Sequence, residues 1–402
     1  MYYIKSPLKA LIFSILTISV IFFCSCAKEY DHDTEEQTTS DVSDTEIEIA
    51  DTSDPADTDV LSPENEIDIR ADELLSSMTL EEKVGQLFLC RNPLLLSDGL
   101  RLIEEKHVGG IIFFGRDFRN SNPEKFKDLI KSYNEKSKTP LLTAVDEEGG
   151  TVCRASLYDA FRHEKFSSPA ELYEAGGIDA ILADAKEKSE FLLDLGLNFN
   201  LAPVADLSQD EQDFIYKRSL GKGTSETSDF VRETVRVMNE SGILSALKHF
   251  PGYGGNADTH IGIVYDTRSI ETLRQNDFLP FIAGIEAGAP VILVSHNIIE
   301  CIDSSLPASL SPKVIDILRT ELKFDGVIMT DDLSMGAIES FTESGNAAVL
   351  AILAGNDLLC CSDIENQYDA VLEAVKDGRI SEDRLNESVL RILKMKLKYN
   401  IC

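Results

Sequence analysis

The chain has 402 residues, and its 38 Lys and Arg against 70 Asp and Glu give a formal charge of −32. A chain this acidic is repelled by nucleic-acid backbones and by anionic membrane surfaces, so neither is an expected binding partner. Because 43% of the residues are hydrophobic, the chain can form a large core, which excludes global disorder.

The first 25 residues have the pattern of an export signal. Lys5 and Lys9 precede the apolar run Ala10–Phe23, which is too short to span a membrane comfortably. The run ends in Phe-Cys-Ser-Cys, which resembles a bacterial lipoprotein processing site with Cys26 as the lipidated residue. An uncleaved anchor or an ordinary signal peptide is the alternative. We expect an exported, outward-facing lipoprotein of the cell membrane that touches the membrane only through its lipid anchor.

Residues 26–66 are predicted to be a disordered acidic tether. Segment 27–66 contains fifteen acidic residues and a single lysine, Lys28, together with many Ser and Thr. Such a composition cannot bury enough apolar surface to offset the conformational entropy that ordering would remove. The tether would hold a domain of residues 67–402 away from the membrane.

The positions of the cysteines indicate little about the function of the protein. The eight cysteines include no Cys-x-x-Cys pair, so a structural zinc site is not expected. We expect most of them to be small buried hydrophobic residues rather than a disulfide framework, which large domains do not need.

Eight apolar runs of strand length alternate with helical stretches in residues 67–402. Near-continuous apolar strands separated by helices indicate a parallel sheet that is covered on both faces. Eight such units in about 330 residues predict an α/β fold, a single-domain (β/α)8 barrel of the TIM type. An open, doubly wound sheet is the alternative. The predicted strands are Val84–Cys90, Gly110–Phe114, Leu141–Val145, Leu197–Ala202, Ser245–Leu247, Val291–Val294, Val327–Met329 and Asp357–Leu359.

Helix starts are marked by capping residues. Thr79 and Glu82 have the spacing of a capping box, in which each side chain binds the backbone N–H of the other residue. Asn122-Pro123 and Ser311-Pro312 each place a capping side chain before a first-turn proline.

In a barrel of this type, functional groups lie just beyond the carboxyl ends of the strands. The residues at these positions are polar, which makes them poor core material and predicts a shared pocket. They are Arg91, Gly115-Arg116, Asp146-Glu147, Asp206, Lys248-His249, Ser295-His296 and Asp331-Asp332.

A Gly-rich stretch after the fifth predicted strand presents Asp258 and His260 two residues apart. A carboxylate at this spacing can hold one imidazole tautomer and stabilise the protonated ring, as an acid/base catalyst requires. A polar loop with an Asx-type turn is the structural alternative. Metal binding by His249, His260 and His296 is disfavoured, because these residues lack a recognisable ligand spacing.

Asp331 follows a predicted buried strand directly, where a carboxylate can attack a ligand at the barrel mouth. The alternative role is capping of the next helix, which Asp commonly provides. With Asp332 beside it, one aspartate can serve each purpose, and Asp331 is nearer the strand.

These two stretches, together with residues 145–150, 201–206 and 218–221, resemble the family 3 glycoside hydrolases. The specific likeness is to single-domain bacterial β-N-acetylhexosaminidases, and it extends from about Leu74 to Lys398. The resemblance implies that Asp331 is the nucleophile and His260 the general acid/base, with Asp258 orienting the imidazole. It implies no metal or organic cofactor.

Five further positions match residues that bind the hydroxyls or the attached groups of the sugar in that family. They are Asp146, Arg154, Arg218, Lys248 and His249. The chain departs from the family pattern at three places. Thr151 stands where Arg is usual, Tyr253 replaces a common His, and Leu220 replaces Phe.

The expected activity is that of a retaining exo-β-N-acetylglucosaminidase. It would release terminal β-linked N-acetylglucosamine from peptidoglycan fragments or chitin oligosaccharides through a glycosyl-enzyme intermediate. Retaining hydrolysis needs a carboxylate at the anomeric carbon and a proton donor for the leaving oxygen. The alternatives are a sugar-binding lipoprotein and a family 3 β-glucosidase. A two-domain β-glucosidase is disfavoured, because no second domain is read after Cys402.

Overall fold

The computed structural model describes residues 62–259, 262–339, 341 and 347–402. The export signal, Cys26, nearly all of the predicted tether and His260 lie outside this part of the chain. Among the described helices, none combines the length and the apolar character that a membrane crossing requires.

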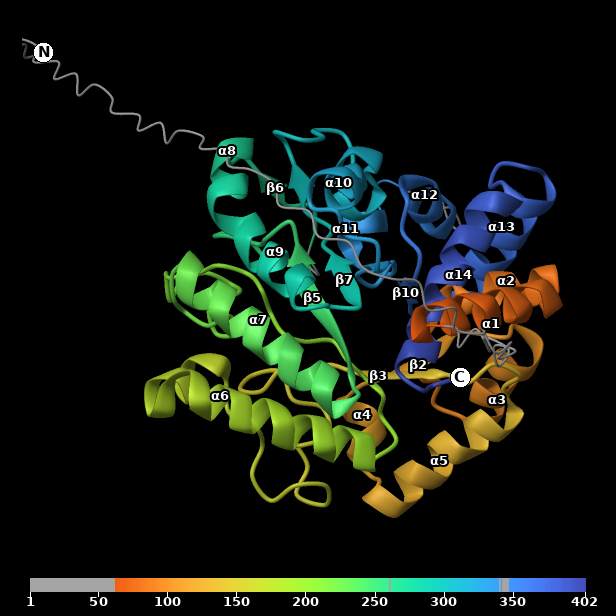
Figure 1. The fold of residues 1–402 in the computed structure, drawn as a ribbon, viewed down its shortest axis with the longest axis horizontal. Helices are drawn as coiled ribbons and strands as arrows, with labels where there is room; N and C mark the ends of the chain where they lie inside the picture. The colour runs from red at the N-terminus through yellow and green to blue at the C-terminus, as the bar shows by residue number, and fades with distance from the viewer. Residues whose placement is uncertain (1–61, 260–261, 340, 342–346) are drawn as a thin grey trace, which may run out of the picture. The chain divides into compact units, whose positions relative to one another are not determined.

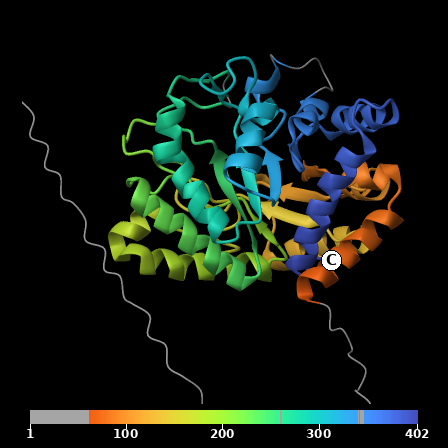
Figure 2. The ribbon, with the colours of Figure 1, turned by 45° about the horizontal axis from the view of Figure 1, so that its top comes forward.

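Eight parallel strands form one sheet that curves into a barrel, and helices lie around it (Figures 1 and 2). The first and last strands of the sheet meet through a parallel bridge between Met329 and Leu358. This closure confirms the predicted barrel and is contrary to the open-sheet alternative. In sheet order the strands are β10 (Leu359–Cys361), β1 (Phe88–Arg91), β2 (Gly110–Phe113), β3 (Leu142–Val145), β4 (Phe199–Asn200), β5 (Leu244–Phe250), β7 (Val291–Val294) and β9 (Val327–Thr330). A separate parallel pair consists of β6 (Tyr265–Asp266) and β8 (Ile298–Ile299).

Each predicted strand overlaps one strand of the barrel, but two boundaries differ notably. The prediction of a strand from Val84 is wrong, because α2 (Leu80–Gln86) continues through Val84 and β1 begins at Phe88. Val84 is a buried residue of α2. Its apolar side chain packs in the core as part of a helix, and it does not belong to a strand. Strand β5 is longer than predicted and includes Lys248 and His249.

The helices connect successive strands and cover the outside of the barrel. They are α1 (Pro63–Ser77), α2, α3 (Leu96–Glu105), α4 (Gly115–Phe118), α5 (Pro123–Lys136), α6 (Pro169–Asp194), α7 (Thr224–Ser241), α8 (Ile270–Thr272), η1 (Leu273–Asp277), α9 (Phe278–Glu286), η2 (Ala308–Leu310), α10 (Pro312–Asp316), η3 (Ile317–Glu321), α11 (Gly336–Glu339), α12 (Ala347–Ala354), α13 (Ile364–Lys376) and α14 (Glu382–Lys398). Helix α6 is interrupted at Gly176 and Gly177, whose backbones are not helical.

The predicted helix starts are correct, and two of the three use the expected caps. Thr79 Oγ1 accepts from the N–H of Glu82, whose carboxylate accepts from the N–H of Thr79 at 2.8 Å. Asn122 Oδ1 accepts from the N–H of Lys125 at 3.0 Å. Ser311 differs, because its hydroxyl donates to Asp303 Oδ2 at 2.8 Å and leaves α10 without a side-chain cap.

The tether boundary at residue 66 is also corrected by the structure. Helix α1 begins at Pro63, with Ser62 as its cap and Glu64 and Glu66 in its first turn. First-turn carboxylates interact favourably with the positive end of the helix dipole. The acidic composition of the segment places Glu64 and Glu66 in the tether. Their position directly after Ser62-Pro63, however, is typical of the first turn of a helix.

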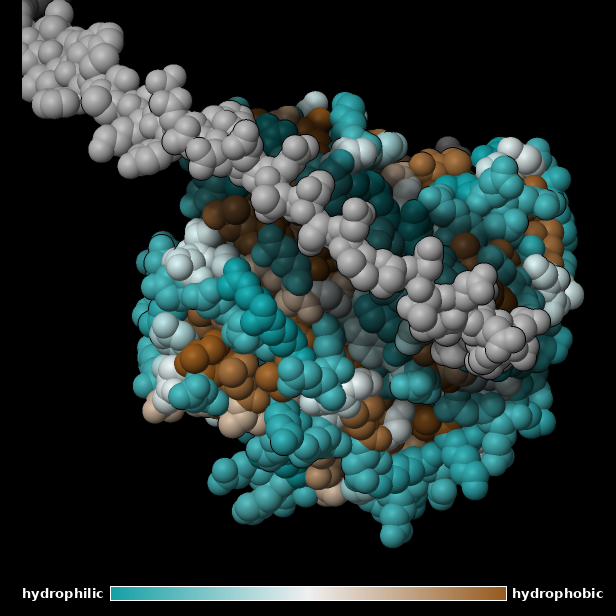
Figure 3. All heavy atoms as spheres, in the orientation of Figure 1, coloured by the Kyte–Doolittle hydropathy of each residue, from teal (hydrophilic) through white to brown (hydrophobic). Residues whose placement is uncertain are grey.

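Two apolar layers on opposite sides of the strands form the core. Leu89, Ile112 and Met329 belong to the layer inside the barrel, whereas Phe88 and Cys90 pack outward against helices. Burial on both sides explains why the strands read as continuous apolar runs. Four of the six described cysteines are buried, and none forms a disulfide in this part of the chain, as predicted. The outer surface over α5 is largely hydrophilic (Figure 3).

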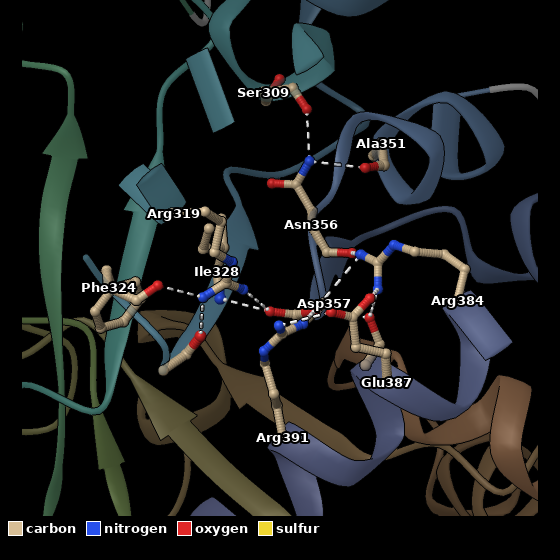
Figure 4. Close-up of polar contacts among 12 residues, drawn as sticks. Ser309, Arg319, Phe324, Ile328, Ala351, Asn356, Asp357, Arg384, Glu387 and Arg391 are labelled. Atoms are coloured by element: carbon tan, nitrogen blue, oxygen red, sulfur yellow. Dashed lines mark hydrogen bonds and ion pairs between the residues drawn. The ribbon is translucent and has the colours of Figure 1, made fainter. Parts of the chain in front are cut away.

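A buried aspartate secures the short closure between β9 and β10 (Figure 4). Asp357 has no exposed surface, and its Oδ2 accepts from the backbone N–H of Ile328 at 3.1 Å. Three guanidinium groups surround the carboxylate: Arg319 at 2.5 Å, Arg391 at 3.2 Å and Arg384 at 3.5 Å. Asp357 therefore links η3 and α14 to the place where the barrel closes.

Replacing Asp357 with Asn should destabilise the protein by about 3–5 kcal/mol, because three partly buried guanidinium groups would lose their shared carboxylate. Denaturant unfolding measures this change. Asp369→Asn is the control, since its pair with Lys106 lies at the surface with the carboxylate 68% exposed. The control should change stability by less than about 1 kcal/mol. Equal effects of the two substitutions would contradict the role assigned to Asp357.

Candidate active site

A cavity of about 580 Å³ opens at the carboxyl ends of the barrel strands. Six of the eight residues that the sequence analysis assigned to catalysis or sugar binding line it: Asp146, Arg154, Arg218, Lys248, His249 and Asp331. Other lining residues include Arg91, Phe114, Glu148, Phe214, Lys217 and Asp332. The volume is in the range of small-molecule sites, and polar groups from several strands converge on it.

Five charged side chains form an ion-pair network in the wall of the cavity. Lys248 Nζ lies 2.7 Å from Asp146 Oδ1 and 2.6 Å from Glu148 Oε1. Arg218 donates two hydrogen bonds to Glu148, at 2.9 Å and 2.7 Å. Arg154 lies 3.7 Å from the other oxygen of Asp146. The network holds Lys248 and Arg218 in fixed orientations, as directed recognition of hydroxyl groups requires.

Glu148 remains charged although it is buried. Burial alone would raise the pKa of its carboxyl, but Arg218 and Lys248 outweigh that effect and hold the pKa well below its usual range. Burial would lower the pKa of Arg218, and Glu148 raises it instead. Glu148 and Arg218 are therefore both charged at neutral pH.

Asp206 orients the ring of His249 from below. The carboxylate is 1% exposed, and its Oδ2 lies 2.7 Å from His249 Nδ1 and accepts from the His249 backbone N–H at 3.1 Å. On the opposite side of the ring, Arg218 Nη2 lies 3.2 Å from His249 Nε2. Because Arg218 can only donate, these contacts favour the tautomer with its proton on Nδ1.

The irregular strand end at Lys248 and His249 explains how two consecutive side chains reach one cavity. The register of β5 against β7 shifts between Lys248 and Phe250. In a regular strand, neighbouring side chains point to opposite faces, and a register shift breaks that alternation.

The two adjacent aspartates have different surroundings. Asp332 accepts hydrogen bonds from the backbone N–H groups of Ser334 and Ser362 at 3.0 and 3.1 Å, and from the Ser362 hydroxyl. These contacts hold the loops that follow β9 and β10 and give Asp332 the structural task. Asp331 lines the same cavity and accepts from the N–H of Asp332 at 2.8 Å.

The loop between β5 and β6 contains Asp258, which is half-buried and is not among the described residues that line the cavity. The base of this loop is anchored by Arg268. Its guanidinium contacts Asp266 at 2.6 Å, Asp277 at 2.8 Å and the carbonyl of Gly252 at 3.0 Å. His260 lies outside the described residues.

Several residues of the predicted pocket lie beneath it instead. Glu147 is fully buried and accepts from the backbone N–H groups of Arg154 and Ala155 at 2.9 and 2.8 Å. His296 is also buried, with Nδ1 2.7 Å from the Ser309 hydroxyl and Nε2 3.0 Å from the Asp332 carbonyl. These side chains support the site from below. Unlike His249, His296 is not among the described residues that line the cavity.

Glu148 is the main site residue that the sequence analysis did not single out. It belongs to the Asp-Glu-Glu-Gly-Gly stretch that carried part of the family resemblance, so its position offered a signal. The choice between Glu147 and Glu148 depends on which side chain faces the cavity.

Comparisons with known proteins agree with this geometry. Residues 79–395 match the "Glycosyl hydrolase family 3 N terminal domain". A β-hexosaminidase of Idiomarina loihiensis is 34% identical over 277 residues, which cover 67% of this chain and 81% of the relative. A secreted glycosyl hydrolase of Arthroderma benhamiae is 31% identical over 309 residues, with coverage of 73% and 85%.

A solved structure of a family 3 β-N-acetylglucosaminidase from Paenibacillus sp. str. FPU-7 superimposes with a TM-score of 0.76 at 33% identity. The match covers 81% of this chain and 63% of the solved chain, so this chain spans less than two thirds of that protein. The family match, the barrel and the polar cavity at its strand ends lead to one conclusion: the chain belongs to glycosyl hydrolase family 3 and is a glycoside hydrolase.

Proposed function

We propose that this protein is a retaining exo-β-N-acetylglucosaminidase. The observation that carries the proposal is the cavity that Asp331 lines together with Lys248, Arg218 and His249. A carboxylate in one cavity with fixed hydrogen-bond donors suits attack on a sugar that is bound at the carboxyl ends of the barrel strands.

In the proposed reaction, Asp331 attacks the anomeric carbon while the glycosidic bond to the leaving oxygen breaks. His260 gives its proton to that oxygen, and Asp258 stabilises the imidazolium that exists before the transfer. His260 then takes a proton from water, whose oxygen bonds to the anomeric carbon and releases Asp331. Two displacements at one carbon retain the configuration of the sugar.

The sugar would be held by Asp146, Arg154, Arg218, Lys248 and His249. Asp146 can accept hydrogen bonds from hydroxyl groups, and the three cations can only donate. The Paenibacillus protein is a β-N-acetylglucosaminidase and the Idiomarina protein a β-hexosaminidase, and this likeness supports N-acetylglucosamine as the sugar. A family 3 glycosidase for another sugar, such as a β-glucosidase, is the alternative.

The charge at the cavity mouth favours a leaving group with a carboxylate. Arg91 stacks over the ring of Phe114 at 4.9 Å, and Lys217 lines the same cavity. Neither cation forms an ion pair within the described part of the chain. N-acetylmuramic acid in peptidoglycan fragments carries a carboxylate and chitin oligosaccharides do not, so we propose peptidoglycan fragments as the natural substrates.

An assay with aryl glycosides tests the proposed activity. The 4-nitrophenyl β-N-acetylglucosaminide should be hydrolysed with kcat/KM at least about 100-fold above that of the matching β-glucoside, because a site that binds the acetamido group through buried polar atoms discriminates strongly. Release of nitrophenolate measures both rates. Equal rates, or preference for the glucoside, would support the β-glucosidase alternative.

The leaving-group preference needs a second comparison in the same assay. N-acetylglucosamine linked to N-acetylmuramic acid should be cleaved faster than chitobiose, and added salt should reduce the difference because it screens the cations. Faster cleavage of chitobiose would favour chitin oligosaccharides.

The assignment of the nucleophile predicts that Asp331→Ala lowers kcat by at least about 10⁴-fold, because the covalent path is lost, while the protein stays folded. A fluorinated N-acetylglucosaminide that keeps its acetamido group and has a good leaving group should label a peptide that contains Asp331, detectable by mass spectrometry. Asp332→Ala is the comparison and should mainly lower thermal stability. If Asp332→Ala abolishes labelling and Asp331→Ala does not, the roles are reversed.

Export and lipid anchoring are proposed from the N-terminal sequence. Residues 1–25 would be the lipoprotein signal peptide, Cys26 the acylated residue, and the segment up to the start of α1 an acidic tether for the barrel. The Arthroderma relative, described as secreted, supports export of the chain.

The anchor predicts that the mature protein starts at an acylated Cys26 and sediments with membranes. Cys26→Ala should move it to the soluble fraction, because two or more acyl chains provide the stable membrane binding that a single chain lacks. Mass spectrometry of the N-terminal peptide measures acylation directly. An intact Met1 or an unmodified Cys26 would refute the anchor.

A further inference from the structure

The segment between β4 and α7 is anchored to the rest of the protein at two positions. Ile215 has no exposed surface and packs in a small apolar cluster with Val204 and Tyr253. Three residues further on, the Arg218 guanidinium donates two hydrogen bonds to Glu148. The backbone between the two anchors forms a turn, in which the N–H of Arg218 donates to the carbonyl of Ile215 at 2.9 Å. These contacts hold the turn against the wall of the cavity.

Two other side chains of this segment, Phe214 and Lys217, line the cavity and are exposed. Phe214 directly precedes Ile215 and is 37% exposed, so part of its ring is open to a ligand. It contacts the ring of Tyr253, with 5.7 Å between the centroids and 44° between the ring planes. Lys217 directly precedes Arg218 and forms no ion pair with any residue that the structure describes. Each anchoring residue therefore has an exposed cavity residue beside it in the sequence.

Phe214 differs from Phe114, the other phenylalanine among the described residues that line the cavity. Arg91 and Arg154 lie over the ring of Phe114, with their guanidinium carbons 4.9 and 5.8 Å from its centroid. No cation lies over the ring of Phe214 in the described part of the chain. The C–H groups of a pyranose ring pack well on such a face, because their partial positive charges meet the negative face of the aromatic ring.

The residues that line the cavity range from buried to exposed. Glu148, Lys248 and His249 are each no more than 5% exposed, whereas Phe214 and Lys217 are exposed. The proposed function places the terminal sugar on the buried charged wall. The remainder of the glycoside must then extend toward solvent, since an exo-acting enzyme releases the sugar at the end of a chain. A leaving group that extends from the buried wall toward solvent can reach the exposed lining residues.

We propose that Phe214 and Lys217 form the subsite that binds the leaving group of the glycoside. The ring of Phe214 packs against the apolar face of the leaving sugar, and the Lys217 ammonium donates to a carboxylate on that sugar. The inference rests on the proposed function, because it takes the terminal sugar to occupy the wall formed by Lys248 and His249. Since the turn that carries the subsite is already anchored, binding does not have to order its backbone.

Phe214→Leu is the main test, because it keeps an apolar side chain beside Tyr253 and removes the flat aromatic face. We expect kcat/KM to fall about three- to tenfold, the size of one aromatic contact, for chitobiose and for N-acetylglucosamine linked to N-acetylmuramic acid. The inhibition constant of free N-acetylglucosamine, which occupies the buried wall alone, should change less than about twofold. Phe214→Tyr keeps the aromatic face and should retain the activity on both disaccharides.

Lys217→Met tests the charged half of the subsite, because it removes the ammonium and keeps a long side chain. It should lower kcat/KM for the muramic acid disaccharide about three- to fivefold, the size of one exposed ion pair. Chitobiose has no carboxylate, so its kcat/KM should change less than about 1.5-fold. The salt dependence of the muramic acid substrate should also weaken, because less of its binding is electrostatic.

Two variants outside the cavity are matched controls. Leu279→Ala changes an apolar side chain of α9 that is 39% exposed, and Lys125→Met removes an exposed cation of α5. Neither residue is among the described residues that line the cavity. Both variants should leave the two disaccharide rates and the inhibition constant of N-acetylglucosamine unchanged. Thermal unfolding of every variant shows that a loss of rate is not a loss of fold.

Three outcomes would overturn the subsite. If Phe214→Leu weakens the binding of N-acetylglucosamine as much as it slows the disaccharides, Phe214 contacts the terminal sugar instead. If it changes neither measurement, Phe214 contacts no part of the substrate. If Lys217→Met affects both disaccharides equally or not at all, Lys217 does not bind the carboxylate. A wild-type protein that neither binds N-acetylglucosamine nor cleaves either disaccharide would instead refute the proposed function.

Discussion

The site depends on one buried carboxylate, Glu148, held between two cations from different strands. Lys248 at the end of β5 and Arg218 in the segment after β4 both contact it within 3 Å. Removing Glu148 would leave Arg218 without this carboxylate in a buried environment, which costs several kcal/mol. The ion pairs of Glu148 with Lys248 and Arg218 therefore fix the geometry of the proposed sugar-binding wall. The same two cations also contact Asp146 and His249.

The barrel makes this arrangement possible by holding strand ends from distant parts of the sequence at one rim. Its interior is filled by a continuous apolar layer, so the carboxyl ends of the strands cannot move independently. The closure between β9 and β10 has few strand contacts, and the Asp357 cluster compensates there with charged hydrogen bonds from η3 and α14. Asp331 directly follows the other end of β9. The Asp357 cluster therefore stabilises the start of the strand that carries Asp331.

The chain is strongly acidic, yet its cavity is rich in cations. Arg91, Arg154 and Lys217 line the cavity in addition to Lys248 and Arg218. Such local charge raises the encounter rate with anionic ligands more than a neutral rim would, and the acidic surface elsewhere keeps the protein soluble. The proposed reaction divides its tasks accordingly: the cavity wall carries the nucleophile and the sugar contacts, and the loop after β5, whose base Arg268 anchors, carries the proton donor.

The sequence alone determined the barrel, the order of its strands and most of the residues at the cavity. Continuous apolar runs identify strands that are buried on both faces, and the fold brings polar residues after such runs to one rim, as Asp146, Lys248 and Asp331 illustrate. Local caps such as Thr79 and Asn122 were equally readable, because capping involves residues within one turn.

Only the tertiary structure decided which polar residues face the cavity and which support it. Glu147 and Glu148 are adjacent and chemically identical, yet one binds backbone N–H groups beneath the site and the other pairs with Lys248 and Arg218. Local sequence carries no information on partners 70 or 100 residues away, and the register shift in β5 breaks the alternation that would have predicted side-chain direction. The separate tasks of Asp331 and Asp332 follow from the same cause, since Ser362 reaches Asp332 from a neighbouring strand.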